Sequence, residues 1–302
     1  MDGFLVIDKP AGITSHDVVA FARRRLKIKK IGHAGTLDPL ATGVLVLGVG
    51  SGTRLLEYLV GCDKEYEAEV VFGATSDTCD ADGEIQRNWE AQIFTKADLE
   101  KVLPRFIGKI SQVPPQFSAI KVNGKAAYAR ARAGEGFELQ PREIEIYSIE
   151  LVRFAYPTVE LKISCSSGTY IRSIARDLGE QLHTGAYLSK LKRTKVGDFN
   201  LNKTIPMKSI RMERLLPLEA GVVFKHLNLT RLEAEKIRVG QKIACREGSS
   251  CNDFVAGFFE GYLLAILEHE KNKNTLKPAK VFHRNLTQEE KSVEFEKRKI
   301  GK

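Results

Sequence analysis

The chain has 302 residues, and its 43% hydrophobic and 28% charged residues are typical of a globular protein. Its 47 Lys and Arg residues outnumber its 38 Asp and Glu residues, and the resulting net charge of +9 favours a polyanionic partner, most commonly nucleic acid. The five cysteines include no Cys-x-x-Cys pair, which argues against a zinc site or a redox pair and favours free thiols in a reducing cytoplasm.

The N-terminal residues do not resemble a signal peptide, because acids stand where cations and a longer apolar run are required. The best apolar stretch, Gly43 to Gly50, is too short to span a bilayer. We therefore expect a cytoplasmic protein that does not use a membrane.

Apolar periodicity predicts a mixture of strands and helices. Strands are predicted at residues 4–7, 43–48, 66–72 and 159–165. Helices are predicted with Ser15 as N-cap and Asp17 in the first turn, from a Thr95–Asp98 capping box towards Phe106, and after Thr169. Because no strict strand–helix–strand repeat links these elements, we predict an α+β fold rather than a doubly wound sheet.

The segment Val113–Arg142 differs from its surroundings and is predicted to be a mobile binding loop. It combines three prolines and several glycines with the cations Lys121, Lys125, Arg130, Arg132 and Arg142. Two further basic runs without acids, Arg23–Lys30 and Lys190–Lys195, are candidate phosphate contacts.

Beyond about Lys225 the predicted elements become shorter and richer in strands. Thr230 and Glu233 predict a capped helix, and Glu260-Gly261 predicts a hairpin turn between two short strands. We therefore predict a large domain over residues 1–225, a small β-rich domain over 226–285 and a charged tail over 286–302.

The string Gly32-His-Ala-Gly-Thr-Leu-Asp-Pro-Leu-Ala-Thr-Gly43 places one carboxylate, Asp38, in a glycine-punctuated loop ahead of a buried strand. Pro39 biases Asp38 away from helical backbone angles and stiffens the chain there. By residue type alone an Asp before Pro is more often a turn residue than a catalytic one. The neighbouring residues decide between these interpretations.

This string, extended to Gly50, resembles the signature of the TruB family of pseudouridine synthases. Other family motifs follow in the same order: Leu5-Val-Ile-Asp-Lys-Pro-Ala-Gly, Asp63-Lys-Glu-Tyr66, Ser76-Asp-Thr-Cys-Asp-Ala-Asp-Gly83, Val113-Pro-Pro-Gln-Phe-Ser-Ala-Ile-Lys121 and Cys165-Ser-Ser-Gly-Thr-Tyr-Ile-Arg172. The region up to Phe282 is similar to an RNA-binding PUA domain. The resemblance implies a mixed, largely antiparallel catalytic sheet, a basic RNA-gripping thumb near residues 113–142 and a PUA-like C-terminal domain.

The resemblance implies that Asp38 is the nucleophile. It implies that Tyr66 stacks on the flipped uracil and accepts the proton that leaves C5, that Arg172 pairs with Asp38, and that Tyr170 orders this pair. Substrate-binding positions implied in the same way are Lys9, His33 and Leu191, with Arg130 and Arg132 in the thumb.

The implied reaction converts a uridine in the T loop of tRNA, at position 55, to pseudouridine. No electrons or groups are transferred, so neither a cofactor nor a metal is expected. The carboxylate could attack the sugar or the ring, or could start an elimination, and the sequence leaves these routes open. The expected partner is the T stem-loop of tRNA, and the thumb favours a monomeric enzyme that needs no guide RNA.

Each residue also has a structural interpretation. Tyr66 and Leu191 fit a core, Tyr170 fits packing between strand and helix, His33 fits a bond to a loop carbonyl, and Lys9 fits a solvated turn. Two other functions compete with catalysis on uridine. The glycines 48, 50 and 52 suggest a dinucleotide-binding turn but lack the final glycine and the βαβ context. A non-catalytic RNA-binding protein or tRNA-folding chaperone would show the same basic loops.

Overall fold

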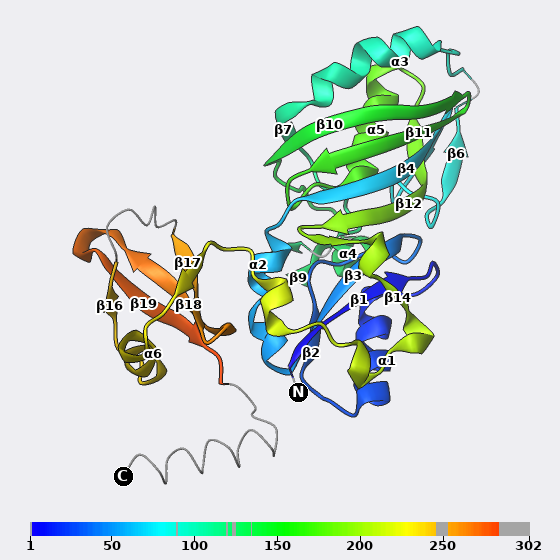
Figure 1. Cartoon of the computed structure of the whole chain (residues 1–302). Coiled ribbons are helices and arrows are strands. Elements are labelled where there is room, and N and C mark those ends of the chain that lie inside the picture. The colour runs from blue at the N-terminus through cyan, green and yellow to red at the C-terminus, as the bar shows by residue number, and fades with distance from the viewer. Residues whose placement is uncertain are drawn as a thin grey trace, which may run out of the picture. The chain divides into compact units, whose positions relative to one another are not determined.

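A computed structural model describes residues 2–88, 90–118, 120–122, 125–133, 135–245 and 253–283 (Figure 1). Contacts within the chain divide it into two compact units. One comprises Leu5–Leu47 and Leu56–Arg214, and the other comprises Met1–Phe4, Gly48–Leu55 and Leu215–Lys302. The tail predicted over residues 286–302 lies outside the described residues.

The strands of the larger unit belong mainly to one mixed sheet with the order β14-β1-β3-β12-β4-β11-β10-β7. Their bounds are Gly3–Lys9 (β1), Ile31–His33 (β2), Thr42–Val49 (β3), Lys64–Phe72 (β4), Gly108–Gln112 (β7), Arg142–Ala155 (β10), Thr158–Cys165 (β11), Ala186–Val196 (β12), Phe199–Asn200 (β13) and Ile205–Pro206 (β14). The pairs β12–β4, β4–β11, β11–β10 and β10–β7 are antiparallel, whereas β12–β3 and β1–β14 are parallel. The α+β prediction with a mixed, largely antiparallel sheet is confirmed.

Alternation along the strands decides which face of the sheet is buried. In β4 the residues Tyr66, Ala68, Val70 and Phe72 are buried, and the intervening glutamates lie on the other face. Helix α5 (Ile171–Gln181) runs across the sheet (Figure 1) and buries Ile174, Ala175 and Leu178, as its periodicity predicts.

The larger unit contains further helices and strands, and it also has the 3₁₀ helices η3 (Leu201–Lys203), η4 (Met207–Ser209) and η5 (Met212–Arg214). The other elements are α1 (Ser15–Leu26), α2 (Leu56–Val60), α3 (Lys96–Val102), α4 (Ala127–Arg132), the 3₁₀ helix η2 (Leu103–Phe106), the strand pair β5 (Ala74–Ser76) with β6 (Ile85–Arg87), and the strand pair β8 (Lys121–Val122) with β9 (Lys125–Ala126). The predicted Thr95–Asp98 capping box is present at α3.

The prediction that Ser15 caps the first helix is wrong by one residue. Thr14 is the N-cap: its hydroxyl accepts from the backbone N–H of Asp17 at 3.1 Å, and the Asp17 carboxylate accepts from the N–H of Thr14 at 2.9 Å. A capping box needs a spacing of three residues, which Thr14 has and Ser15 lacks. The Ser15 hydroxyl is therefore available for another partner, described below.

The C-terminal part of the second unit is a small β structure. Its sheet has the order β15-β17-β18-β19-β16, formed by His226–Asn228 (β15), Ile243–Ala244 (β16), Phe254–Phe259 (β17), Tyr262–Glu270 (β18) and Thr275–Val281 (β19). Helix α6 (Arg231–Arg238) has the predicted Thr230–Glu233 capping box. Glu260 and Gly261 form the predicted hairpin turn with φ of +52° and +80°, a conformation that glycine adopts without strain.

The core of this β structure is formed by side chains from its helix and strands, among them Ala234, Ile237, Val255, Ala265 and Leu276. In the part of the chain that the structure describes, no helix is long and apolar enough to cross a membrane.

Candidate active site

The loop between β2 and β3 carries Asp38 and is held at both ends by backbone hydrogen bonds. The N–H of Ala34 donates to the carbonyl of Val46 at 2.9 Å, and the N–H of Ala41 donates to the carbonyl of Asp38 at 3.1 Å. The second bond closes a tight turn across Pro39. The Asp38 carboxylate is therefore attached to a backbone that these hydrogen bonds hold in place.

Ser15 and Lys9 attach this loop to the first strand and helix. The Ser15 hydroxyl accepts from the N–H of Leu37 at 2.8 Å and donates to its carbonyl at 3.1 Å. The Lys9 ammonium donates to three backbone carbonyls, those of Ile13 at 2.7 Å, Pro10 at 2.9 Å and Pro39 at 3.2 Å. These contacts fix the residues on either side of Asp38.

Lys9 is fully buried and is not the solvated turn residue of the structural interpretation. Burial lowers the pKa of its ammonium to about 8, and the neighbouring Asp38 carboxylate opposes this effect. The structure places Lys9 against the loop, where its ammonium binds the Pro39 carbonyl. Its contact with a nucleotide stays a prediction.

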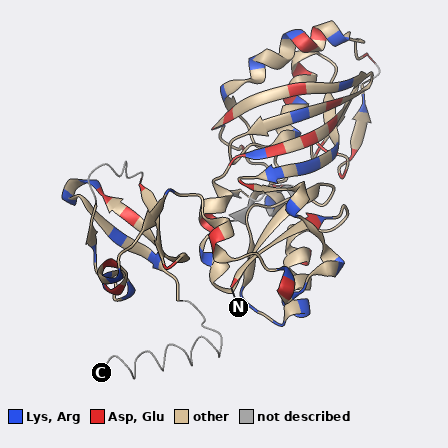
Figure 2. Ribbon diagram, viewed as in Figure 1, with Lys and Arg blue, Asp and Glu red and all other residues tan. Residues whose placement is uncertain are grey.

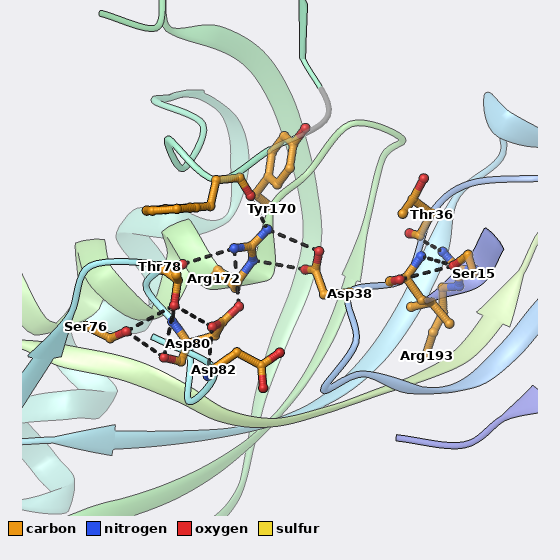
Figure 3. A network of polar contacts seen from close by, with 12 residues as sticks. Ser15, Thr36, Asp38, Ser76, Thr78, Asp80, Asp82, Tyr170, Arg172 and Arg193 are labelled. Carbon is orange, nitrogen blue, oxygen red and sulfur yellow. Dashed lines mark hydrogen bonds and ion pairs between the residues drawn. The ribbon is translucent and has the colours of Figure 1, made fainter. Parts of the chain in front are cut away.

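Arg172 meets Asp38 from the first turn of α5 (Figure 3). Its Nη2 donates to Asp38 Oδ1 at 3.2 Å, and its Nε lies 3.0 Å from Asp38 Oδ2 in an ion pair that is not aligned as a hydrogen bond. The Arg172 side chain is 5% exposed, whereas that of Asp38 is 33% exposed. One carboxylate thus faces the surface while the cation that orients it is buried. The predicted Asp38–Arg172 pair is present.

A second carboxylate, Asp80, meets the same guanidinium. Arg172 Nη1 lies 3.2 Å from Asp80 Oδ2 and donates to the carbonyl of Thr78 at 3.0 Å, while Nη2 also donates to the carbonyl of Phe117 at 3.1 Å. Asp80 Oδ1 accepts from the Thr78 hydroxyl at 2.6 Å and from the N–H of Asp82 at 3.1 Å. Burial raises the pKa of Asp80, and its bond to Thr78 and the charge of Arg172 oppose the rise.

Asp80 is a site residue that the sequence reasoning missed. It lies in the Ser76–Gly83 motif, which supported the family resemblance but was given no role. Two carboxylates on one buried guanidinium also explain a cation at a helix N-terminus, a position that the helix dipole disfavours. The sequence shows Arg172 at the start of this helix. A cation at a position that the helix dipole disfavours indicates that a carboxylate lies nearby.

Tyr66 and Tyr170 are the two tyrosines that the resemblance places at the site. Tyr66 is buried on β4, and burial raises the pKa of its phenol while Arg193 opposes the rise. Tyr170 is the residue before α5, where its N–H donates to Gln112 Oε1 at 2.9 Å and its carbonyl accepts from Gln112 Nε2 at 3.0 Å. Tyr170 lies beside Arg172 (Figure 3), which is compatible with the ordering role that the resemblance implies.

His33 is half-buried and Leu191 is buried. Burial lowers the pKa of His33, and its buried Nδ1 has no hydrogen-bond partner among the described residues. Leu191 is 7% exposed and lies opposite Ala68 in the β12–β4 ladder. Both the pocket interpretation and the core interpretation of Leu191 fit this position.

The two thumb arginines differ in what the structure describes. Arg130 Nε donates to Glu135 Oε2 at 2.7 Å, and its guanidinium lies over the Phe137 ring at 5.4 Å from the centroid. The side chain of Arg132 lies outside the described residues. Phosphate binding by either residue stays a prediction.

The interpretation of the run Lys190–Lys195 as phosphate contacts is wrong for Arg193. Arg193 is 1% exposed, and the side chains of Lys190 and Lys195 pair with Glu69 at 2.9 Å and Glu65 at 3.1 Å. Figure 2 shows the acidic and basic residues interleaved on these strands. The sequence contains a pattern that predicts these ion pairs: glutamates alternate with apolar residues along β4 and can pair with an adjacent basic strand.

The described residues contain no group of three His, Cys, Asp or Glu side chains that could hold a metal ion. The arrangement is instead one partly exposed carboxylate, Asp38, oriented by the buried Arg172 guanidinium, with the Tyr170 ring beside it. Such a group can act as a nucleophile or as a base.

Comparisons with known proteins give a consistent result. The family model described as TruB family pseudouridylate synthase (N terminal domain) matches residues 23–171, and the model described as tRNA pseudouridylate synthase B C-terminal domain matches residues 172–222. A protein of Thermobifida fusca named tRNA pseudouridine synthase B is 41% identical over 294 residues, which cover 93% of this chain and 98% of that relative. One of Carboxydothermus hydrogenoformans with the same name is 47% identical over 245 residues, 80% of this chain and 85% of that relative.

Solved structures are similar in fold. The crystal structure of a Cbf5-Nop10-Gar1 complex contains a chain that is 25% identical with a TM-score of 0.74, covering 93% of this chain and 85% of that one. An H/ACA RNP bound to a substrate RNA containing 2'-deoxyuridine contains a chain that is 23% identical with a TM-score of 0.72 over the same shares.

Proposed function

The chain belongs to the TruB family of pseudouridylate synthases, and on that premise we propose that it converts the T-loop uridine at position 55 of tRNA to pseudouridine with Asp38 as nucleophile. The family makes it a pseudouridine synthase, and its relatives named tRNA pseudouridine synthase B support tRNA as the substrate. The observation that carries the catalytic part is the partly exposed Asp38 carboxylate, which the buried Arg172 guanidinium holds by both oxygens.

The reaction breaks the bond between N1 and C1′, turns the uracil and forms a bond between C5 and C1′. C5 loses a proton and N1 gains one, so oxidation state and atom count are unchanged, and one carboxylate with one group that transfers a proton is sufficient. Asp38 supplies the carboxylate, and Tyr66 accepts the C5 proton and stacks on the base. These two groups can serve attack on the sugar, attack on the ring or an elimination.

The target base must leave its stack before it can reach Asp38. Flipping costs a few kcal/mol, which stacking on an aromatic ring partly offsets. Tyr66 provides this ring, Lys9 and His33 lie beside the loop, and Leu191 forms an apolar wall. Ordered loops on both sides of Asp38 reduce the rearrangement that the bound nucleotide requires.

We further propose that the protein acts alone, as a monomer in the cytoplasm, without guide RNA. The thumb-like segment with Arg130 and Arg132 supports this, because a stand-alone enzyme must grip its substrate itself. The relatives that match most of the chain at 41–47% identity are named as tRNA enzymes, whereas the matching chains of the H/ACA RNP and of the Cbf5-Nop10-Gar1 complex are 23% and 25% identical. The PUA-like residues 226–285 add affinity for tRNA in this scheme.

One experiment tests the proposal. The purified protein is incubated with an unmodified tRNA transcript, without cofactor or added RNA, and pseudouridine is mapped along the product. We expect one modified site, in the T loop, and none in a transcript with cytidine at position 55. Binding without any pseudouridine would contradict the proposal, and a modified uridine elsewhere would contradict the assigned position.

A further inference from the structure

Arg193 is a buried cation that the reaction scheme above does not use. It is 1% exposed, although its neighbours Lys190 and Lys195 reach carboxylates at the surface. A buried charge is unfavourable unless it is paired or hydrogen-bonded. The groups that Arg193 binds therefore indicate what it is there to hold.

All three nitrogens of the guanidinium bind carbonyls on either side of Asp38, two in its loop and one in β3. Nε donates to the carbonyl of Val44 at 2.8 Å, Nη2 to that of Gly35 at 3.1 Å and Nη1 to that of Thr36 at 3.4 Å. Figure 3 shows Arg193 with Thr36 beside Ser15. Because Gly35 and Thr36 precede Asp38 and Val44 follows it, one side chain holds both ends of the loop.

The same residue is placed against the second group of the reaction. Arg193 lies directly opposite Tyr66 in the antiparallel β12–β4 ladder, so their side chains share one face of the sheet. On its other edge Arg193 pairs with Gly43 of β3, where a Cβ would come within 2.3 Å of the Arg193 carbonyl oxygen. Burial raises the pKa of Tyr66 and the charge of Arg193 opposes this rise, as expected for a cation close to the phenol.

We propose that Arg193 is a positioning residue that fixes the Asp38 loop and aligns it with Tyr66, so that nucleophile and aromatic platform meet the same uracil. Its kinetic consequence rests on the pseudouridine synthase activity proposed above, whereas its effect on the loop does not. A core residue that only stabilised the fold would lower the melting temperature without changing the loop or the turnover of the folded enzyme.

The test compares Arg193→Lys with the wild-type protein and with Arg153→Gln. Lysine keeps the charge, but its single nitrogen cannot replace the three separate guanidinium nitrogens that bind the carbonyls of Gly35, Thr36 and Val44. Arg153 is a matched control, because it also lies on a strand of the large sheet but pairs with Glu160 at the surface, at 3.3 Å. Hydrogen–deuterium exchange of peptides covering residues 34–44 is measured without RNA, and kcat and KM are measured on the tRNA transcript well below the melting temperatures.

In Arg193→Lys we expect loop exchange to rise by about tenfold and kcat to fall by at least about tenfold, with KM within about threefold of the wild type. Arg153→Gln should change none of these quantities. A Lys variant with normal exchange and normal kcat would overturn the proposal, even if it melts at a lower temperature.

The proposal can still be tested if the Lys variant does not fold or if the wild-type protein is inactive. If Arg193→Lys does not fold, the wild-type protein decides, because its 34–44 peptides must be as protected as the β3 strand, and free exchange there overturns the proposal. If the wild-type protein makes no pseudouridine, the proposed function fails, while the exchange comparison still decides the role of Arg193.

Discussion

Asp38 and Asp80 bind the same guanidinium, yet replacing each with asparagine should have different consequences. In Asp38→Asn we expect no pseudouridine formation, tRNA affinity within about tenfold of wild type, and a loss of about 1 kcal/mol or less in unfolding free energy. The Asp38 side chain is 33% exposed, and Arg172 keeps Asp80 and two carbonyls in its absence. The Asp38→Asn variant should therefore lose catalytic activity and remain folded.

Asp80→Asn should be the more destabilising change. The Asp80 side chain is 4% exposed, and Oδ1 already accepts from Thr78 and from the N–H of Asp82. If the asparagine oxygen keeps these two contacts, its amide group must face the Arg172 guanidinium, so donor meets donor. Breaking a buried pair costs roughly 3–5 kcal/mol, and the remaining Asp38 contact reduces this to about 2–3 kcal/mol.

Thermal unfolding by circular dichroism and tritium release from C5-labelled tRNA measure the two effects separately. At about 2–4 °C per kcal/mol for a unit of this size, Asp80→Asn should melt about 4–12 °C below wild type and Asp38→Asn within about 4 °C of it. Turnover by Asp38→Asn above a trace would remove Asp38 as nucleophile. A normal melting temperature for Asp80→Asn would refute the argument from burial.

Three further changes give distinct results. Tyr66→Phe should bind tRNA normally but lose at least ~10²-fold in turnover if the phenol is the C5 base. Tyr66→Leu should also weaken binding of the flipped base by roughly 1–3 kcal/mol. Near-normal kcat in the Phe variant would exclude the role of Tyr66 as base. Changing Arg130 and Arg132 to Ala should weaken binding and flatten the slope of log K against log salt, and an unchanged slope would mean that neither side chain contacts phosphate. A chain that ends at Lys225 should retain kcat and show a raised KM; a stable truncated protein that binds tRNA normally but is inactive would contradict the domain assignment.

Local patterns predicted the elements well, because their causes lie within a few residues. The alternation in β4, the helical face of α5 and the Glu260–Gly261 turn follow from side-chain direction and backbone freedom at neighbouring positions. The misplaced cap at Ser15 was also a local matter. Thr14 and Ser15 are both good N-cap residues, and only the three-residue spacing to Asp17 distinguishes them.

The site was harder to predict, since it joins segments that are far apart in the chain. Asp38 and Arg172 are separated by 134 positions, and the family motifs rather than the physics of the sequence suggested that they pair. Arg193 shows the limit most clearly. Its neighbours are lysines with surface partners, and the carbonyls that allow its burial lie 149 to 158 positions away.

The three buried cations around Asp38 share one mode of binding. Lys9, Arg172 and Arg193 each donate to at least two backbone carbonyls of turns and loops, and a carbonyl buried without a donor is unfavourable. Loops rich in glycine and proline cannot pair these oxygens among themselves as a strand or helix would. Multivalent side-chain donors therefore replace secondary structure at the place where the chain must leave it to present Asp38. Because these donors are set before RNA binds, the carboxylate can be ready for a flipped base, and the free energy of binding can be used on the nucleotide rather than on ordering the protein.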